Sequence, residues 1–142
     1  MWLSRLAPAG RKSPPPRDTQ LARVLVIEDD QSIRNLIVYA LGDEGYQVDA
    51  ASDGQQALAL IAQHQPDVIV LDMEMPGMDG WEFAKLYRER CEQPAPIVVV
   101  TAAKDAAQRG TEVDAESSLA KPFDLTDLLD RVSAAARESD VQ

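Results

Sequence analysis

The 142-residue chain is long enough for one domain, and its 45% hydrophobic content can supply a single buried core. A formal net charge of −10 argues against direct nucleic-acid binding, which needs a basic surface to neutralise phosphates. The single cysteine, Cys91, excludes an internal disulfide, and no apolar run approaches the ~18 residues of a membrane span. Residues 1–6 are too short for the apolar region of a signal peptide, so we expect a cytoplasmic protein.

The N-terminal segment differs in composition from the rest of the chain. Residues 1–20 carry four basic side chains against one acidic one, a net charge of +3, which leaves −13 on the remaining residues. With three consecutive prolines at 14–16, this composition predicts a disordered, basic, proline-rich tail over residues 1–21. It is either a dispensable leader or an arm that docks a partner. We predict a folded domain at residues 22–138 and a short C-terminal tail at residues 139–142.

Apolar runs and helical periodicities alternate along the predicted domain. The runs at residues 24–27, 68–71 and 97–101 have the composition of strands buried on both faces. Residues 46–50 alternate as a half-exposed edge strand, and a last, short strand lies near residues 119–120. Helical spacing is found at residues 33–41, 55–63, 81–90 and from 124 onwards, while residues 104–109 allow two turns before Gly110. This alternation predicts an α/β fold, with a parallel sheet covered by helices on both faces.

Polar side chains follow four of the five predicted strands at the point where each strand ends. They are Glu28, Asp29 and Asp30, then Asp72, Thr101 and Lys121. Because parallel strands direct their carboxyl ends to one edge, these side chains should converge. Neighbouring carboxylates repel one another unless cations lie among them, and Lys121 supplies one positive charge. Oxygen ligands suit Mg²⁺ as a further cation, and the residues alone do not choose between Asp29 and Asp30. The competing interpretation, unrelated surface acids, requires four coincidences at four strand ends.

This group of residues suits phosphoryl transfer. A carboxylate such as that of Asp72 can act as a nucleophile toward a phosphoryl group and form an aspartyl phosphate. Mg²⁺ and Lys121 would offset the charge that develops on the phosphoryl oxygens. The hydroxyl of Thr101 can donate a hydrogen bond to the product, which would make it a sensor of phosphorylation.

These motifs resemble the receiver domain of bacterial two-component response regulators over about residues 22–137. The resemblance rests on Val26-Ile27-Glu28-Asp29-Asp30, Asp67 through Leu71-Asp72, Met75-Pro76-Gly77-Met78-Asp79-Gly80, Val100-Thr101-Ala102 and Lys121-Pro122-Phe123. It implies a flavodoxin-like (βα)5 three-layer sandwich with strand order 2-1-3-4-5 and a phosphoacceptor at Asp72. It also implies Mg²⁺ ligation by Glu28, Asp29, Asp72 and the backbone carbonyl of Glu74, which favours Asp29 over Asp30.

The same resemblance implies a switch and phosphate-binding set of Thr101, Ala102 and Lys121, with a cis peptide bond before Pro122. Glu74 and Ala103 are the candidates for tuning hydrolysis of the acyl phosphate, since a group beside the phosphoacceptor can repel or orient attacking water.

Two features depart from the receiver pattern. Ser118 stands three positions before Lys121, where receivers commonly carry an aromatic residue that moves with the threonine. The interval of 20 positions between Thr101 and Lys121 is also shorter than is usual for receivers. We therefore expect a short or irregular helix in this interval and an atypical route of signal output.

The expected function is a stand-alone receiver that accepts a phosphoryl group from a sensor histidine kinase or a histidine phosphotransfer protein. Phosphorylation would change its protein–protein interactions, as a monomer or a phosphorylation-dependent dimer, with no nucleic-acid or membrane partner. Such a receiver takes part in its own phosphorylation and dephosphorylation without being a conventional enzyme. One alternative, a non-phosphorylated adaptor, is favoured by Ser118. The other, a phosphatase of the haloacid-dehalogenase type, is disfavoured because its nucleophile should lie on the first strand and be followed two residues later by an aspartate, whereas Glu74 occupies that position after Asp72.

Overall fold

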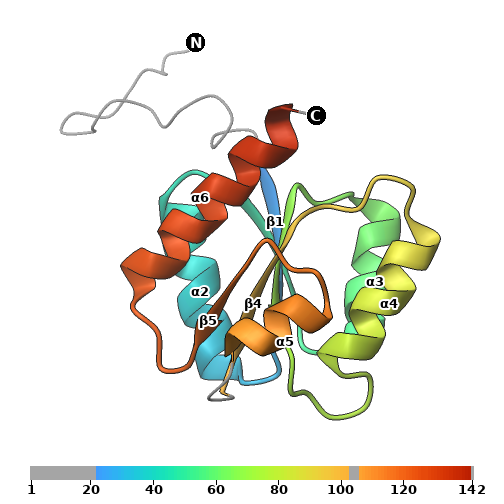
Figure 1. Ribbon diagram of the computed structural model, residues 1–142. Coiled ribbons are helices and arrows are strands. Elements are labelled where there is room, and N and C mark those ends of the chain that lie inside the picture. The colour runs from blue at the N-terminus through green and yellow to red at the C-terminus, as the bar shows by residue number, and fades with distance from the viewer. Residues whose placement is uncertain (1–21, 103–105, 142) are drawn as a thin grey trace, which may run out of the picture.

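The computed structural model describes residues 22–102 and 106–141, which form one five-stranded parallel sheet and five helices (Figure 1). The strands are β1 (Arg23–Ile27), β2 (Gln47–Ala51), β3 (Val68–Asp72), β4 (Ile97–Thr101) and β5 (Ser117–Ala120). Their order is β2-β1-β3-β4-β5, as predicted. The helices are α2 (Gln31–Asp43), α3 (Gly54–Gln63), α4 (Gly80–Arg90), α5 (Ala106–Glu112) and α6 (Leu125–Val141).

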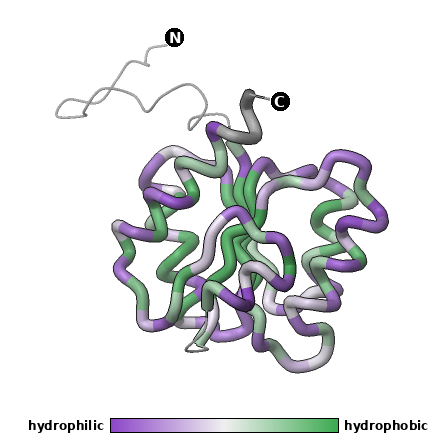
Figure 2. Tube along the Cα trace, in the orientation of Figure 1, coloured by the Kyte–Doolittle hydropathy of each residue, from purple (hydrophilic) through white to green (hydrophobic). Residues whose placement is uncertain are grey.

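Helices cover both faces of the sheet, with α2 and α6 on one side and α3 and α4 on the other (Figure 1). The residues of each central strand alternate between the two hydrophobic layers: in β1, Val24 and Val26 pack toward α2 and α6, while Leu25 and Ile27 pack toward α3 and α4. This two-sided burial explains why the central strands are continuous apolar runs. Figure 2 shows the hydrophobic strands in the middle and the hydrophilic helix surfaces outside.

Aspartates begin three of the helices. Asp30, Asp53 and Asp79 each accept a hydrogen bond from the backbone N–H three residues later, at 2.8 to 3.0 Å. Such N-caps occupy donors that the first helical turn leaves unpaired. The cap at Asp30 places the start of α2 directly after the end of β1, and the cap at Asp79 places the start of α4 close to the end of β3.

The structure differs from the sequence predictions within the helices. The sequence allowed two helical turns before Gly110 in a short or irregular helix, and the helix in this interval, α5, is short but continues through Gly110 to Glu112. A Cβ atom at Gly110 would lie 3.0 Å from the Cβ of Ser118, so this glycine permits close packing of α5 on β5.

The C-terminal boundary also differs from the expectation. Helix α6 runs to Val141, so it includes most of the segment that was assigned to a C-terminal tail at residues 139–142. The predicted N-terminal tail, residues 1–21, lies outside the described residues. None of the helices within 22–102 and 106–141 combines the length and the hydropathy that a membrane-spanning helix requires.

Gly80 provides a test of the packing at the start of α4. A Cβ atom there would lie 2.7 Å from the Cα of Met73 and 3.0 Å from the carbonyl oxygen of Asp72. We expect Gly80→Ala to lower the free energy of unfolding by about 1–3 kcal/mol, because the backbone at the end of β3 must move. Gly42→Ala on α2 is the matched control, since nothing lies within 4 Å of its added Cβ. It should stabilise the protein by about 0.5 kcal/mol. Urea denaturation of both variants measures the difference, and equal stabilities would contradict the prediction.

Candidate functional site

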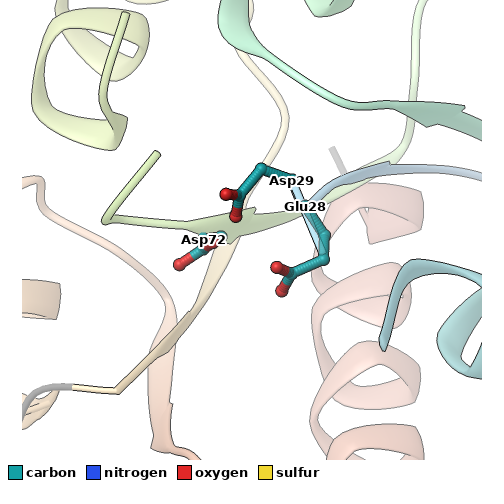
Figure 3. A group of neighbouring side chains, drawn as sticks. All are labelled: Glu28, Asp29 and Asp72. Carbon is teal, nitrogen blue, oxygen red and sulfur yellow. The ribbon is translucent and has the colours of Figure 1, made fainter. Parts of the chain in front are cut away.

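The carboxyl ends of the central strands bring acidic side chains together. Glu28 and Asp29 directly follow β1, and Asp72 is the last residue of β3. The pairing of Ile27 with Leu71 aligns these two strand ends. One carboxylate oxygen from each of Glu28, Asp29 and Asp72 lies within 4.8 Å of the others (Figure 3). We call these three residues the acidic cluster.

The members of the acidic cluster differ in exposure. The side chains of Glu28 and Asp72 are only 2% and 3% exposed, whereas Asp29 is open to solvent. A buried carboxylate is costly unless a cation or hydrogen-bond donors compensate for lost hydration. Glu28 Oε2 accepts a hydrogen bond from the N–H of Asp30, and Asp72 Oδ1 accepts one from the N–H of Glu74.

Lys121 supplies a positive charge at the acidic cluster. Its Nζ lies 2.9 Å from Glu28 Oε1 and 3.6 Å from Asp72 Oδ2. The hydrogen bond with Glu28 and the neighbouring acids raise the pKa of Lys121 above its usual value, although burial acts in the opposite direction. With all groups ionised, three carboxylates and one ammonium leave two negative charges uncompensated, which matches one divalent cation.

The carboxyl group of Asp72 has a raised pKa. Burial, followed by repulsion from Glu28, raises its pKa from 3.8 to about 8, although Lys121 and the N–H of Glu74 act in the opposite direction. A raised pKa of this kind means that the ionised form of Asp72 lacks sufficient positive charge around it. The acidic cluster therefore favours any ligand that adds positive charge.

The other predicted residues lie at the same edge of the sheet. Thr101 ends β4 and is fully buried, and its carbonyl accepts a hydrogen bond from the N–H of Lys121 at 2.8 Å. Ala102 follows it and is exposed. The side chain of Glu74 is exposed two residues after Asp72, and the Lys121–Pro122 peptide bond is cis. Ala103 lies outside the described residues.

The geometry separates Asp29 from Asp30, which the residues alone could not do. The carboxylate of Asp30 caps α2 by accepting a hydrogen bond from Ile33. The carboxylate of Asp29 lies with those of Glu28 and Asp72. All the side-chain ligands that the cluster offers are oxygens, and the exposure of Asp29 leaves room for water. This donor set fits Mg²⁺, which takes oxygen ligands and retains several waters.

One residue near the acidic cluster, Arg34, was not predicted from the sequence. The Nη1 of Arg34 donates hydrogen bonds to the carbonyl oxygens of Glu28 at 2.9 Å and Asp29 at 3.4 Å. In the sequence, Arg34 was simply a polar residue off the apolar stripe of a helix. The sequence did offer one signal. Arg34 lies one turn into a helix that starts just after two candidate metal ligands, Glu28 and Asp29.

Comparison with known proteins decides the family. The chain matches the family model for the response regulator receiver domain over residues 24–133. This chain belongs to the response regulator receiver family. As a receiver domain, it is a component of two-component signalling, and the resemblance found in its sequence is confirmed.

Relatives and solved structures agree with this assignment. The response regulator MprA of Mycolicibacterium vanbaalenii is 40% identical over 119 residues, which cover 82% of this chain and 51% of that protein. The chain thus spans about half the length of the curated relatives it matches. The receiver also resembles Vibrio cholerae chemotaxis protein CheY4, at 36% identity and a TM-score of 0.74, covering 81% of this chain and 98% of that one. The receiver domain of Francisella response regulator 1452 gives 30% identity and a TM-score of 0.76, with coverages of 83% and 98%.

The raised pKa of Asp72 leads to a stability prediction for this receiver. Because the folded state holds the Asp72 proton more tightly than the unfolded chain does, ionisation of Asp72 costs stability as the pH rises from 3.8 toward about 8. Without Mg²⁺, Asp72→Asn should therefore be more stable than wild type by on the order of 1–3 kcal/mol near pH 8. This difference should fade as the pH falls toward 4.

Denaturation in the presence of a chelator, followed across this pH range, tests the prediction. Added Mg²⁺ should then stabilise the wild type more than Asp72→Asn, since the variant lacks one carboxylate of the cluster. A variant that is no more stable than wild type near pH 8 would contradict the destabilising effect assigned to the buried, ionised carboxylate of Asp72.

Proposed function

We propose that this chain is a phosphoacceptor receiver that takes a phosphoryl group onto Asp72 from a phosphohistidine. The donor would be a sensor histidine kinase or a histidine phosphotransfer protein in the cytoplasm. The observation that carries this proposal is the convergence of the acidic cluster with Lys121 at the strand ends. Glu28, Asp29, Asp72 and the carbonyl of Glu74 would hold Mg²⁺, which supplies positive charge to the phosphoryl oxygens when it is bound.

The chemistry follows from the position of Asp72. A carboxylate oxygen of Asp72 attacks the phosphorus of the donor, and the bond between phosphorus and the imidazole nitrogen breaks, with its electron pair leaving on the imidazole. The ammonium of Lys121, 3.6 Å from Asp72 Oδ2, is close enough to follow the transferred group and neutralise one of its oxygens. Neutralising these oxygens is the principal help that a protein gives to phosphoryl transfer.

The product would be sensed by Thr101 and Ala102. Thr101 is fully buried at the end of β4, the neighbour of β3 in the sheet. A hydrogen bond from its hydroxyl to the phosphoryl group would draw the end of β4 toward Asp72 and change the surface that follows it. The domain would in this way switch its protein–protein interactions while lacking the turnover of a conventional enzyme.

Phosphorylation can be tested with a small phosphoryl donor. Incubation with acetyl phosphate and Mg²⁺ should add the mass of one phosphoryl group to the intact protein, and Asp72→Asn should abolish the addition. Asp29→Asn should raise the Mg²⁺ concentration needed for phosphorylation, because it removes one carboxylate of the cluster.

Asp30→Asn is the matched control, since asparagine also caps helices and the fold should be kept. It should be phosphorylated as well as wild type. Wild-type protein that gains no mass, or Asp72→Asn that gains as much as wild type, would overturn the proposal. Partner binding that is identical in wild type and Asp72→Ala would favour the adaptor function instead.

Glu74 is proposed to tune the lifetime of the phosphorylated state, together with Ala103. Its exposed carboxylate stands two residues after Asp72, where it can affect the approach of water to the acyl phosphate. Glu74→Ala and Glu74→Gln should reach the same extent of phosphorylation as wild type but lose the phosphoryl group at altered rates. Intact mass measured over time after removal of the donor gives these half-lives. Unchanged half-lives in both variants would remove Glu74 from this role.

A further inference from the structure

The side chain of Arg34 reaches from α2 back to the loop that follows β1. One nitrogen of its guanidinium, Nη1, contacts the carbonyl oxygens of two consecutive residues, Glu28 at 2.9 Å and Asp29 at 3.4 Å. These are the two residues of this loop whose carboxylates join Asp72 in the acidic cluster. Arg34 is half-buried, and its hydrogen bond to the carbonyl of Glu28 is partly shielded from water.

Glu28 and Asp29 are held in different ways. Glu28 is buried, its N–H donates to the carbonyl of Ala51 at 3.0 Å, and its carboxylate contacts Lys121. Asp29 is exposed, and the contact from Arg34 anchors its own carbonyl. Since the carboxylate of Asp29 is exposed, whereas that of Glu28 is buried and contacts Lys121, the anchor should matter more for Asp29 than for Glu28.

We propose that Arg34 is a positioning residue for metal binding, which fixes the backbone of Glu28 and Asp29 so that their carboxylates face Asp72. This inference rests on the proposed function, because it assumes that the acidic cluster binds Mg²⁺. The guanidinium suits this role because it is always protonated and carries two N–H groups on one nitrogen, enough for two carbonyls. Groups that orient metal ligands typically contribute 10–100-fold to metal affinity.

The hydrogen bonds that begin α2 do not involve this side chain. The backbone N–H of Arg34 donates to the carbonyl of Asp30 at 2.9 Å, and the carboxylate of Asp30 caps the helix. Both hydrogen bonds remain when the side chain of Arg34 is changed. Its substitution should therefore leave a folded protein with a less ordered loop after β1.

Calorimetric titration with Mg²⁺ tests the inference on the whole chain. Arg34→Met keeps the apolar stem but removes the donors, and it should weaken Mg²⁺ binding by about tenfold. Arg34→Lys keeps the charge on a shorter side chain and should also weaken binding by severalfold. Lys85→Met, which removes an exposed charge on α4, is the matched control and should bind as wild type does.

Phosphorylation with acetyl phosphate separates positioning from other roles. The rate of Arg34→Met should approach that of wild type at saturating Mg²⁺, while the Mg²⁺ concentration giving half the maximal rate rises. Circular dichroism in the absence of Mg²⁺ should show that Arg34→Lys and Arg34→Met are folded. If Arg34→Met fails to fold, the Mg²⁺ affinity of Arg34→Lys alone decides, with a severalfold loss supporting the inference and wild-type affinity overturning it.

The outcomes distinguish this inference from the proposed function. Binding of Mg²⁺ by Arg34→Met within twofold of wild type would overturn it, as would wild-type affinity in Arg34→Lys, which would show that charge alone matters. A wild-type protein that binds no Mg²⁺ would overturn it as well. Arg34-dependent Mg²⁺ binding in a protein that gains no phosphoryl group would support the inference and reject phosphorylation.

Discussion

The main constraint on this structure is that carboxylate oxygens of Glu28, Asp29 and Asp72 lie within 4.8 Å of one another. Two of them are almost fully buried, so neither water nor distance relieves their repulsion. Lys121 contacts both buried acids, but one ammonium cannot neutralise three carboxylates. The remaining negative charge is an unfavourable contribution in the isolated protein and a favourable one when a cation binds. Carboxylate repulsion therefore lowers the stability of the metal-free protein and raises its affinity for cations.

The surrounding backbone explains how the fold withstands this repulsion. Two adjacent parallel strands, buried on both faces, deliver Glu28 and Asp72 to the same edge. The loop after β1 is closed by the cap at Asp30 and by Arg34, and the loop after β3 is closed by Gly80, whose N–H bonds to the carbonyl of Met73 at 3.0 Å. The acids therefore cannot move apart without disturbing the first turns of α2 and α4.

The central part of this arrangement could be predicted from the sequence, for a physical reason. Strands buried on both faces must be apolar, and the first polar residue after such a run must lie at the strand end, so Glu28, Asp72 and Thr101 could be placed without coordinates. Contacts between a helix and a loop leave no comparable pattern. Arg34 was indistinguishable from any polar residue on an exposed helix face, and the choice between Asp29 and Asp30 needed the cap geometry. The end of α5 could not be placed from the sequence. Glycine weakens helices, but the missing side chain of Gly110 lets α5 approach Ser118, and this tertiary contact outweighs the local preference.

The packing of Gly110 on Ser118 affects how a structural change at the acidic cluster could be transmitted to the surface of α5. An aromatic residue at the position of Ser118 would connect the end of β4 to this face, and no such residue is present. Instead α5 contacts α4: the indole N–H of Trp81 donates to Glu112 Oε1 at 2.8 Å, and the guanidinium of Arg109 lies 5.4 Å from the centre of the Trp81 ring. Trp81 follows Gly80, which packs against the end of β3. Contacts at the start of α4 therefore connect the end of β3 to α5, in addition to the direct packing of α5 on β4 and β5.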